Sequence, residues 1–379
     1  MNRVMNGTSL YTGLVDRYRA RLPLAPGAEA ISLGEGATPL IKLRNIPGDV
    51  GFSGEIYVKY EGLNPTGSFK DRGMTVAVTQ AHAEGSKAII CASTGNTSAA
   101  AAAYAARAGM TAFVLIPEGK IAMGKFSQTA IHGCSVIQIR GNFDDGMQLV
   151  KDVAETLPVT VVNSVNPYRL QGQKTASFEI VEALGDAPDY HCLPVGNAGN
   201  ISAYWMGYRE MATPRAGETP IAPDSFSYLR EAVTDKLPVM CGFQAAGAAP
   251  FLAGAPVKNP ETVATAIRIG NPQSWAHAET AVRESNGHFD AIEDDEILAA
   301  QKLLAEREGV FCEPASASSL AGALRDIASG KIKPGSRVVC TLTGHGLKDP
   351  DIAIKQATAE PVTVDATRQA VEDALVKGL

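Results

Sequence analysis

The chain is poor in the cysteine patterns on which disulfide frameworks and thiolate metal sites depend. Its six cysteines are scattered along 379 residues, and no Cys-x-x-Cys pair occurs among them. They are Cys91, Cys134, Cys192, Cys241, Cys312 and Cys340. Because a disulfide-rich secreted domain or a zinc site usually shows closely spaced pairs, this spacing predicts no metal site. Buried, reduced thiols in a cytoplasmic protein are the expected alternative.

Long apolar runs and an excess of basic residues are also lacking. No apolar run approaches the ~20 residues needed to span a membrane. Arg17, Arg19 and Arg21 interrupt the stretch in which a signal peptide would have its apolar core. The net charge of −6 and the pI near 5.6 give no electrostatic reason to bind nucleic acid or an anionic membrane. Any anionic ligand should therefore be bound locally, in a pocket.

A complete nucleotide-binding motif is missing as well. No Gly-x-Gly-x-x-Gly follows a predicted strand, so a Rossmann-type dinucleotide site is not expected. Residues 119–125 match the Gly-x-x-x-x-Gly-Lys part of a P-loop, but Phe126 stands where Ser or Thr should bind magnesium. Nucleotide hydrolysis is therefore not expected. Two uses of Lys125 fit equally well, since it could help to neutralise a substrate phosphate or merely cover a helix face.

Strand-like and helix-like segments alternate along the chain. The first strand-like runs cover residues 88–92, 111–117, 135–139 and 159–162, with helical stretches between them. A second alternating set extends from the helical stretch at 175–184 to the strand-like run at 337–342, and residues 213–235 read as an insertion. This pattern predicts an α/β fold of parallel βαβ units with helices on both faces. The length favours two lobes, because one core usually stops growing below 379 residues.

Lys70 stands where a strand-like run gives way to a helix-like one. Residues 55–60 alternate as a strand does, and 71–83 have the apolar spacing of a helix, with Gly85 after them. The partial positive charge of a helix N-terminus disfavours an ammonium group, which would favour the neutral amine that attacks an aldehyde. Taken alone, Lys70 reads as a surface lysine paired with Asp71, because surface lysines are the default.

Three further loops follow apolar runs and contain groups that bind anions. Residues 93–98 open an alanine-rich helix with Ser, Thr and Asn, which serve either as ordinary N-caps or as an anion site. Residues 196–200 contain two glycines before another helix, and such a backbone can close around a phosphate. Residues 343–349 begin with a threonine and contain two glycines, and taken alone they read as a plain turn.

Together these segments resemble a known family. A lysine able to form a Schiff base, an anion cradle, an Asn-bearing helix N-terminus and a Thr-Gly loop resemble the fold-type II pyridoxal-phosphate enzymes. Within that group, the sequences of four segments are similar to those of the threonine synthases. The segments are residues 64–72, 92–98, 163–169 and 341–349. The resemblance extends from about Gly36 to Asp351.

The resemblance implies two lobes of mostly parallel sheet, as in the β subunit of tryptophan synthase. The larger, cofactor-binding lobe would be discontinuous and comprise residues 1–59 and 166–379. Residues 60–165 would form the smaller inserted lobe. The cleft between the lobes would hold pyridoxal 5′-phosphate.

The resemblance also implies the cofactor contacts. Lys70 would form the Schiff base and then act as the acid and base that moves protons. Asn96 would contact the 3′-oxygen of the ring, and Thr343 would face the ring nitrogen. The phosphate cradle would consist of Gly196, Asn197, Ala198, Gly199 and Asn200.

On the same resemblance the reaction would convert O-phospho-L-homoserine and water to L-threonine and phosphate. The substrate carboxylate would bind Ser93, Thr94 and Thr97. A second anion site would bind the substrate phosphate through Asn163, Ser164 and Arg169, and Asn197 could reach it from the cradle loop. Relatives are commonly dimers, so a homodimer is expected. Taken alone, Arg169 reads as a member of a surface ion pair.

Two competing functions stay open from the sequence. A dehydratase or a β-replacement enzyme of the same fold would keep Lys70 and the cradle without needing Arg169, Asn163 or Ser164. A non-catalytic cofactor-binding protein would need none of the acid–base chemistry. His345 could tune the ring-nitrogen contact or could face a turn without a catalytic duty. Residues 357–379 predict one amphipathic helix, packed either on the body or on a second subunit.

Overall fold

A computed structural model describes the chain except for residues 1–9, 120–122, 142, 215–230, 358–360 and 379. Most of the insertion predicted at 213–235 lies outside the described residues, and so does the side chain of Lys125. Neither prediction is therefore tested by the fold.

The larger of two sheets has six strands in the order β1-β2-β10-β7-β8-β9. All neighbouring strands are parallel except β1, which runs antiparallel to β2. The bounds are β1 Leu40–Lys42, β2 Glu55–Tyr60, β7 Tyr190–Pro194, β8 Val239–Ala245, β9 His288–Ile292 and β10 Arg337–Leu342. The carboxyl ends of the parallel strands therefore meet along one edge, where α/β proteins bind ligands.

The smaller sheet has four parallel strands in the order β5-β4-β3-β6. The bounds are β3 Ala88–Ala92, β4 Thr111–Pro117, β5 Ser135–Ile139 and β6 Val159–Val161. Every residue of β3 is buried, which explains its unbroken apolar run. The parallel α/β architecture predicted from the sequence is confirmed. The strands β1, β8 and β9 were not predicted.

Helices cover both faces of the larger sheet. Val338 and Val339 are successive residues of β10, and their side chains enter two different cores. The core of Val338 lies against α12 and α13, and that of Val339 against α8, α9 and α11. The bounds are α8 Thr175–Leu184, α9 Gly199–Met211, α11 Trp275–Glu284, α12 Asp294–Glu308 and α13 Pro314–Ala328. This alternation is the two-residue period of a strand buried on both faces.

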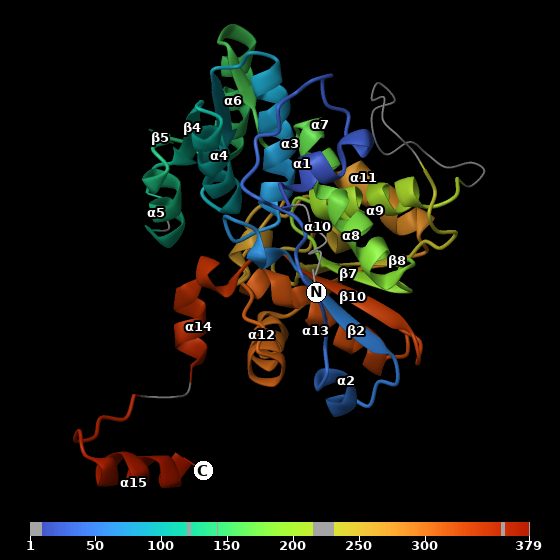
Figure 1. Ribbon diagram of the computed structural model, residues 1–379, viewed down its shortest axis with the longest axis vertical. Coiled ribbons are helices and arrows are strands. Elements are labelled where there is room, and N and C mark those ends of the chain that lie inside the picture. The colour runs from blue at the N-terminus through green and yellow to red at the C-terminus, as the bar shows by residue number, and fades with distance from the viewer. Residues whose placement is uncertain (1–9, 120–122, 142, 215–230, 358–360, 379) are drawn as a thin grey trace, which may run out of the picture.

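The smaller sheet is covered in the same way. Its core on one face includes residues of α3 and α4, and its core on the other face includes Met147 and Val150 of α6. The bounds are α3 Lys70–Ala83, α4 Asn96–Arg107, α5 Met123–Ile131, α6 Phe143–Thr156 and α7 Pro167–Gln173. Figure 1 shows β4, β5, α4, α5 and α6 gathered at the opposite end of the molecule from β2, α12 and α13. The division into lobes at residues 60 and 165 remains a prediction.

Short elements complete the chain. They are α1 Leu14–Arg17, α2 Ile46–Asp49, α10 Pro250–Ala253, α14 Pro350–Gln356 and α15 Arg368–Gly378, with 3₁₀ turns at Arg19–Arg21, Glu61–Leu63, Thr265–Ile267 and Gly346–Lys348. In Figure 1 the red helix α15 stands apart from both sheets, and it exposes Val371, Leu375 and Val376. In the described part of the chain, none of the helices combines the length and the apolar character needed to cross a membrane.

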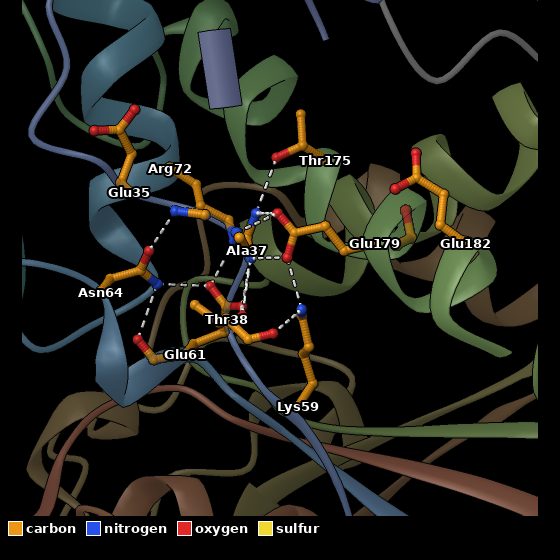
Figure 2. A network of polar contacts seen from close by, with 12 residues as sticks. Glu35, Ala37, Thr38, Lys59, Glu61, Asn64, Arg72, Thr175, Glu179 and Glu182 are labelled. Atoms are coloured by element: carbon orange, nitrogen blue, oxygen red, sulfur yellow. Dashed lines mark hydrogen bonds and ion pairs between the residues drawn. The ribbon is translucent and has the colours of Figure 1, made fainter. Parts of the chain in front are cut away.

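A buried network of charges anchors the first turn of α3 (Figure 2). Arg72 donates from Nε to Glu61 Oε2 and from Nη2 to Glu179 Oε2, both at 2.6 Å. Lys59 donates to the same oxygen of Glu179 at 2.6 Å. All four side chains are at most 5% exposed, so the ion pairs are little screened by water. Since Arg72 lies two residues after Lys70, this network fixes the start of α3.

We predict that Glu179→Gln destabilises the protein by about 3–5 kcal/mol, because it leaves two buried cations with less countercharge. Burial alone would raise the pKa of Glu179, but Arg72 and Lys59 lower it to about 2. The stabilisation is therefore complete above the ordinary glutamate pKa and is lost as the pH falls toward 2. Denaturant unfolding at pH 7 measures the difference.

Glu182→Gln on the same helix is the matched control. Glu182 pairs with Arg17 at the surface, where both side chains are more than a third exposed. Such pairs contribute at most about 1 kcal/mol. Equal effects of the two variants would contradict the role assigned to the buried network.

Candidate active site

Lys70 is the first residue of α3, and its turn is joined to the loop after β10. The amide of Phe69 donates to the carbonyl of Thr343 at 2.9 Å. The amide of His345 donates to the carbonyl of Gly67, also at 2.9 Å. Two segments that lie 270 residues apart in the sequence therefore hold the Lys70 turn at the carboxyl edge of the larger sheet.

The surroundings of Lys70 favour its neutral amine. Its side chain keeps some accessible surface, as a site that admits a ligand requires. The pKa of Lys70 is lowered to about 7, first because burial removes hydration and then because Arg169 is positively charged, while Glu313 opposes the shift. The sequence predicted this direction from the helix N-terminus alone. Burial and Arg169 are the causes that the sequence could not show.

Glu313 is a site residue that the sequence analysis missed. It is fully buried and precedes Pro314 as the N-cap residue of α13. Its carboxylate accepts hydrogen bonds from Asn96 Nδ2 at 3.1 Å and from Thr343 Oγ1 at 3.3 Å. A Cβ on Gly344 would lie 2.5 Å from Glu313 Oε1, so only glycine fits there. In the sequence, Glu-Pro before a helix looks like an ordinary capping site, and nothing signals its burial.

The loop before α4 brings Asn96 into the same cluster. Asn96 begins α4 and is buried, and its Oδ1 makes no hydrogen bond within the described part of the chain. The amide of Gly95 donates to Ser93 Oγ at 3.1 Å, which closes the loop into a turn. Thr94 is exposed and Thr97 is half-buried, so both hydroxyls lie at the accessible end of the helix.

The loop at 196–200 has the tight backbone of a cradle. Ala198 adopts a left-handed conformation with φ 63° and ψ 4° directly before α9, a conformation that is strained for alanine. A Cβ on Gly196 would lie 3.0 Å from Ile267 Cα, so a side chain there would be crowded. Asn200 is buried and donates to the carbonyl of Pro194 at 2.6 Å. The first amides of α9 therefore point into a closely shaped loop, which favours an anion.

Arg169 is buried inside α7 and is not a surface residue. It is 1% exposed, and Nη1 donates to the carbonyl of Val162 at 3.0 Å. Its Nε and Nη2 atoms make no hydrogen bond, and no carboxylate pairs with it among the described residues. Burial lowers the pKa of Arg169 to about 10. The surface ion pair that the sequence allowed is therefore wrong, and two guanidinium nitrogens remain available to an anion near Lys70.

The other two residues predicted beside Arg169 differ from it. Asn163 is buried, and its side chain donates to the carbonyl of Ala92 at 2.9 Å and accepts from the amide of Ala92 at 3.0 Å. Its amide group thus links the end of β3 to the segment after β6. Ser164 is half-buried. The role of both residues in substrate binding stays a prediction.

The loop after β10 holds Thr343 rigidly. Thr343 is 4% exposed and lies 3.0 Å from Ser316, oxygen to oxygen. His345 points elsewhere, because its Nδ1 accepts from the amide of Leu347 at 3.1 Å and its ring stacks on Tyr60. Of the two uses considered for His345, the geometry favours the turn-facing imidazole.

Comparison with known proteins agrees with this geometry. A family model described as "Pyridoxal-phosphate dependent enzyme" matches residues 31–344. The threonine synthase of Halalkalibacterium halodurans is 52% identical over 371 residues, which are 98% of this chain and 99% of that protein. The threonine synthase of Mycobacterium tuberculosis strain H37Rv is 56% identical over 357 residues, 94% of each chain. The chain belongs to the threonine synthase family of pyridoxal-phosphate-dependent enzymes. It is therefore a lyase of fold type II, as its sequence predicted.

Solved structures of lower identity share the fold. Maize serine racemase is 21% identical, with a TM-score of 0.68 over 97% of this chain and 99% of that chain. An O-ureido-L-serine synthase is 17% identical, with a TM-score of 0.70 over 93% of this chain and 100% of that one. At such identities the likeness concerns the arrangement of the two sheets and their helices.

The arrangement fits pyridoxal 5′-phosphate, the cofactor of this family. The cofactor needs an amine for its aldehyde, and Lys70 has a lowered pKa. Its phosphate needs amides at a helix N-terminus, which the loop before α9 presents. Its ring needs polar partners in the plane, and the buried Oδ1 of Asn96 lacks a hydrogen bond in the described structure. Each of these groups comes from a different element, so the fold itself assembles the site.

We predict that covalent attachment of pyridoxal phosphate to the apoprotein becomes faster as the pH rises through about 7. The reason is that only the neutral amine of Lys70 attacks the aldehyde, and its pKa is lowered to about 7. Glu313→Gln removes a charge that favours the ammonium, so the midpoint of the profile should fall. Borohydride trapping at a series of pH values measures it. A midpoint near 10 in the unmodified protein would contradict the assignment.

Proposed function

We propose that the chain converts O-phospho-L-homoserine and water to L-threonine and phosphate, the last step of threonine biosynthesis. It would thus act as a carbon–oxygen lyase on a phosphate. The observation that carries the proposal is the buried guanidinium of Arg169, which has no carboxylate partner among the described residues. A substrate with a phosphate remote from its amino group needs such an anion site in addition to the cofactor cradle.

Lys70 would have two tasks. It binds the cofactor, and once substrate has replaced it there, it moves protons at the substrate Cα and Cβ. Pyridoxal phosphate, when bound, supplies an electron sink that makes both protons removable. A pKa of about 7 suits an amine that must accept and return protons near neutral pH.

Two anion sites would orient the substrate. Ser93, Thr94 and Thr97 lie at the N-terminus of α4, where backbone amides and hydroxyls favour a carboxylate. Arg169, whose charge acts on Lys70, would bind the phosphate, with Ser164 as a further hydroxyl. Binding both ends would place Cα and Cβ within reach of the same amine.

Thr343 would meet the ring nitrogen. A hydroxyl does not force protonation of that nitrogen as a carboxylate would, so Lys70 has a larger share in controlling proton positions. Thr343 also contacts Glu313 and Ser316, and these contacts fix the rotamer of its hydroxyl.

The experiment is a product assay on the purified, cofactor-loaded protein. With O-phospho-L-homoserine we expect equal amounts of phosphate and L-threonine. A dehydratase or β-replacement enzyme would instead act on serine or threonine or on an O-substituted serine, and would release no phosphate here. Ammonia release from L-threonine with no phosphate release would move the assignment to those relatives.

We also propose that the enzyme is a cytoplasmic homodimer. Among the described residues, α15 exposes three apolar side chains and α14 exposes Ile354, which would be covered more favourably by a second subunit. Sedimentation analysis of the full chain and of a chain ending at residue 357 would test the oligomeric state.

A further inference from the structure

Four side chains of types that can bind a metal, three cysteines and one histidine, lie in one row across the larger sheet. In the pairing register, Cys340 of β10 is opposite Cys192 of β7, Cys192 is opposite Cys241 of β8, and Cys241 is opposite His288 of β9. Register partners in a parallel sheet point to the same face, and the three cysteines all enter the core beneath α13. This row was not predicted from the sequence, because its members are separated by 47 to 148 positions.

Asp326 of α13 lies over the end of this row. The ligand atoms of Cys241, His288 and Asp326 are all within 4.8 Å of one another. Asp326 is fully buried, and the distance from its Oδ2 to His288 Nε2 is 2.9 Å. Yet neither oxygen of Asp326 nor Nε2 of His288 makes an aligned hydrogen bond within the described residues. With a protonated imidazole this contact is an ion pair, and with a neutral imidazole the two atoms present their lone pairs to one cation.

We propose that Cys241 Sγ, His288 Nε2 and the Asp326 carboxylate bind a zinc-class divalent cation. Sulfur, imidazole and carboxylate together favour zinc over calcium or magnesium, which prefer oxygen alone. One thiolate and one carboxylate would carry two negative charges, which the divalent cation would balance. Lys331 also lies near the site, with its Nζ 3.4 Å from Asp326 Oδ1.

The position separates this site from the catalytic centre. Asp326 follows Glu313 by thirteen residues along α13, which corresponds to about 20 Å along a helix axis. The cluster therefore lies toward the amino ends of β8 and β9, away from Lys70. The ion would have a structural role, since it would join the edge strand β9 to β8 and to α13. The half-exposed His288 on the edge strand supplies an entry path.

Cobalt titration of the cofactor-loaded enzyme tests the proposal. Tetrahedral cobalt absorbs red light, where pyridoxal phosphate does not. We expect one equivalent of Co²⁺ to produce this absorption, Zn²⁺ to abolish it and the cofactor spectrum to stay unchanged. Cys241→Ser and Asp326→Asn should weaken Co²⁺ binding more than about a hundredfold, since even residues behind the ligands contribute 10–100-fold. Cys134→Ser, which changes a thiol near the smaller sheet, should leave binding unchanged.

X-ray absorption at the zinc edge tests the proposed ligands even if a variant fails to fold, because it uses the unmodified enzyme. In the zinc-loaded unmodified enzyme, the first shell should contain sulfur at about 2.3 Å and nitrogen or oxygen at about 2.0 Å. A shell without sulfur would overturn the proposal. So would the absence of red absorption at one equivalent, or equal affinity in Asp326→Asn and the unmodified enzyme.

Discussion

Lys70→Ala abolishes the release of both phosphate and L-threonine from O-phospho-L-homoserine. Loss of a general acid–base group alone lowers the rate by about 10²–10⁴-fold, and this variant also loses the amine that binds the cofactor. We therefore expect turnover to fall at least ~10⁴-fold, with no borohydride-stable adduct on the protein. The same product assay and mass analysis of the trapped protein measure both effects.

The matched control for this prediction is Lys87→Ala. Lys87 lies beyond the end of α3 and is exposed, so its loss should leave both products unchanged. The fold should survive in Lys70→Ala, because the charge network around Arg72 and Glu179 that fixes α3 does not include Lys70. Normal turnover in a folded Lys70→Ala protein would refute the catalytic assignment as a whole.

The sequence predicts those parts of the fold that local patterning determines. The strand β3 is buried throughout, and β4 is mostly buried. The predicted ranges of β3, β4 and β5 coincide with the observed strands. The strands β8 and β9 were not predicted. In the case of β9, the strand is half-buried at the sheet edge and its sequence contains His288 and Asp290. Periodicity is a weak signal where a strand is neither fully buried nor regularly alternating.

The residues of the candidate site also differ in whether the local sequence could predict them. Loops with glycines at helix N-termini have a local signal, so 196–200 and Asn96 could be proposed from their sequence. Glu313 could not, because its importance depends on burial and on contacts with residues 30 and 217 positions away. The burial of Arg169 could not be predicted from the sequence either. Asn163 has a contact that the sequence could not show, since its side chain completes the backbone pairing of Ala92. Its role in substrate binding stays a prediction.

The substitution Arg169→Gln tests the second anion site. A hydrogen bond to a charged group contributes about 1.5–3 kcal/mol, so kcat/KM for O-phospho-L-homoserine should fall about 10- to 100-fold. Cofactor binding should remain. Inhibition by inorganic phosphate should weaken by a similar factor, an effect that a purely structural arginine would not produce. Loss of cofactor with unchanged phosphate inhibition would place Arg169 at the cofactor instead.

The charge of Arg169 has a second effect that must be separated from the first. Because Arg169 lowers the pKa of Lys70, its removal should raise that pKa and move the pH profile of cofactor attachment upward. At pH 7 the variant would then lose activity from both causes, whereas well above the new midpoint only the loss of phosphate binding would remain. Arg169→Lys keeps the charge but not the forked geometry. It should retain the pH profile of the unmodified enzyme while still binding phosphate more weakly, and this combination would assign the two effects to charge and to shape.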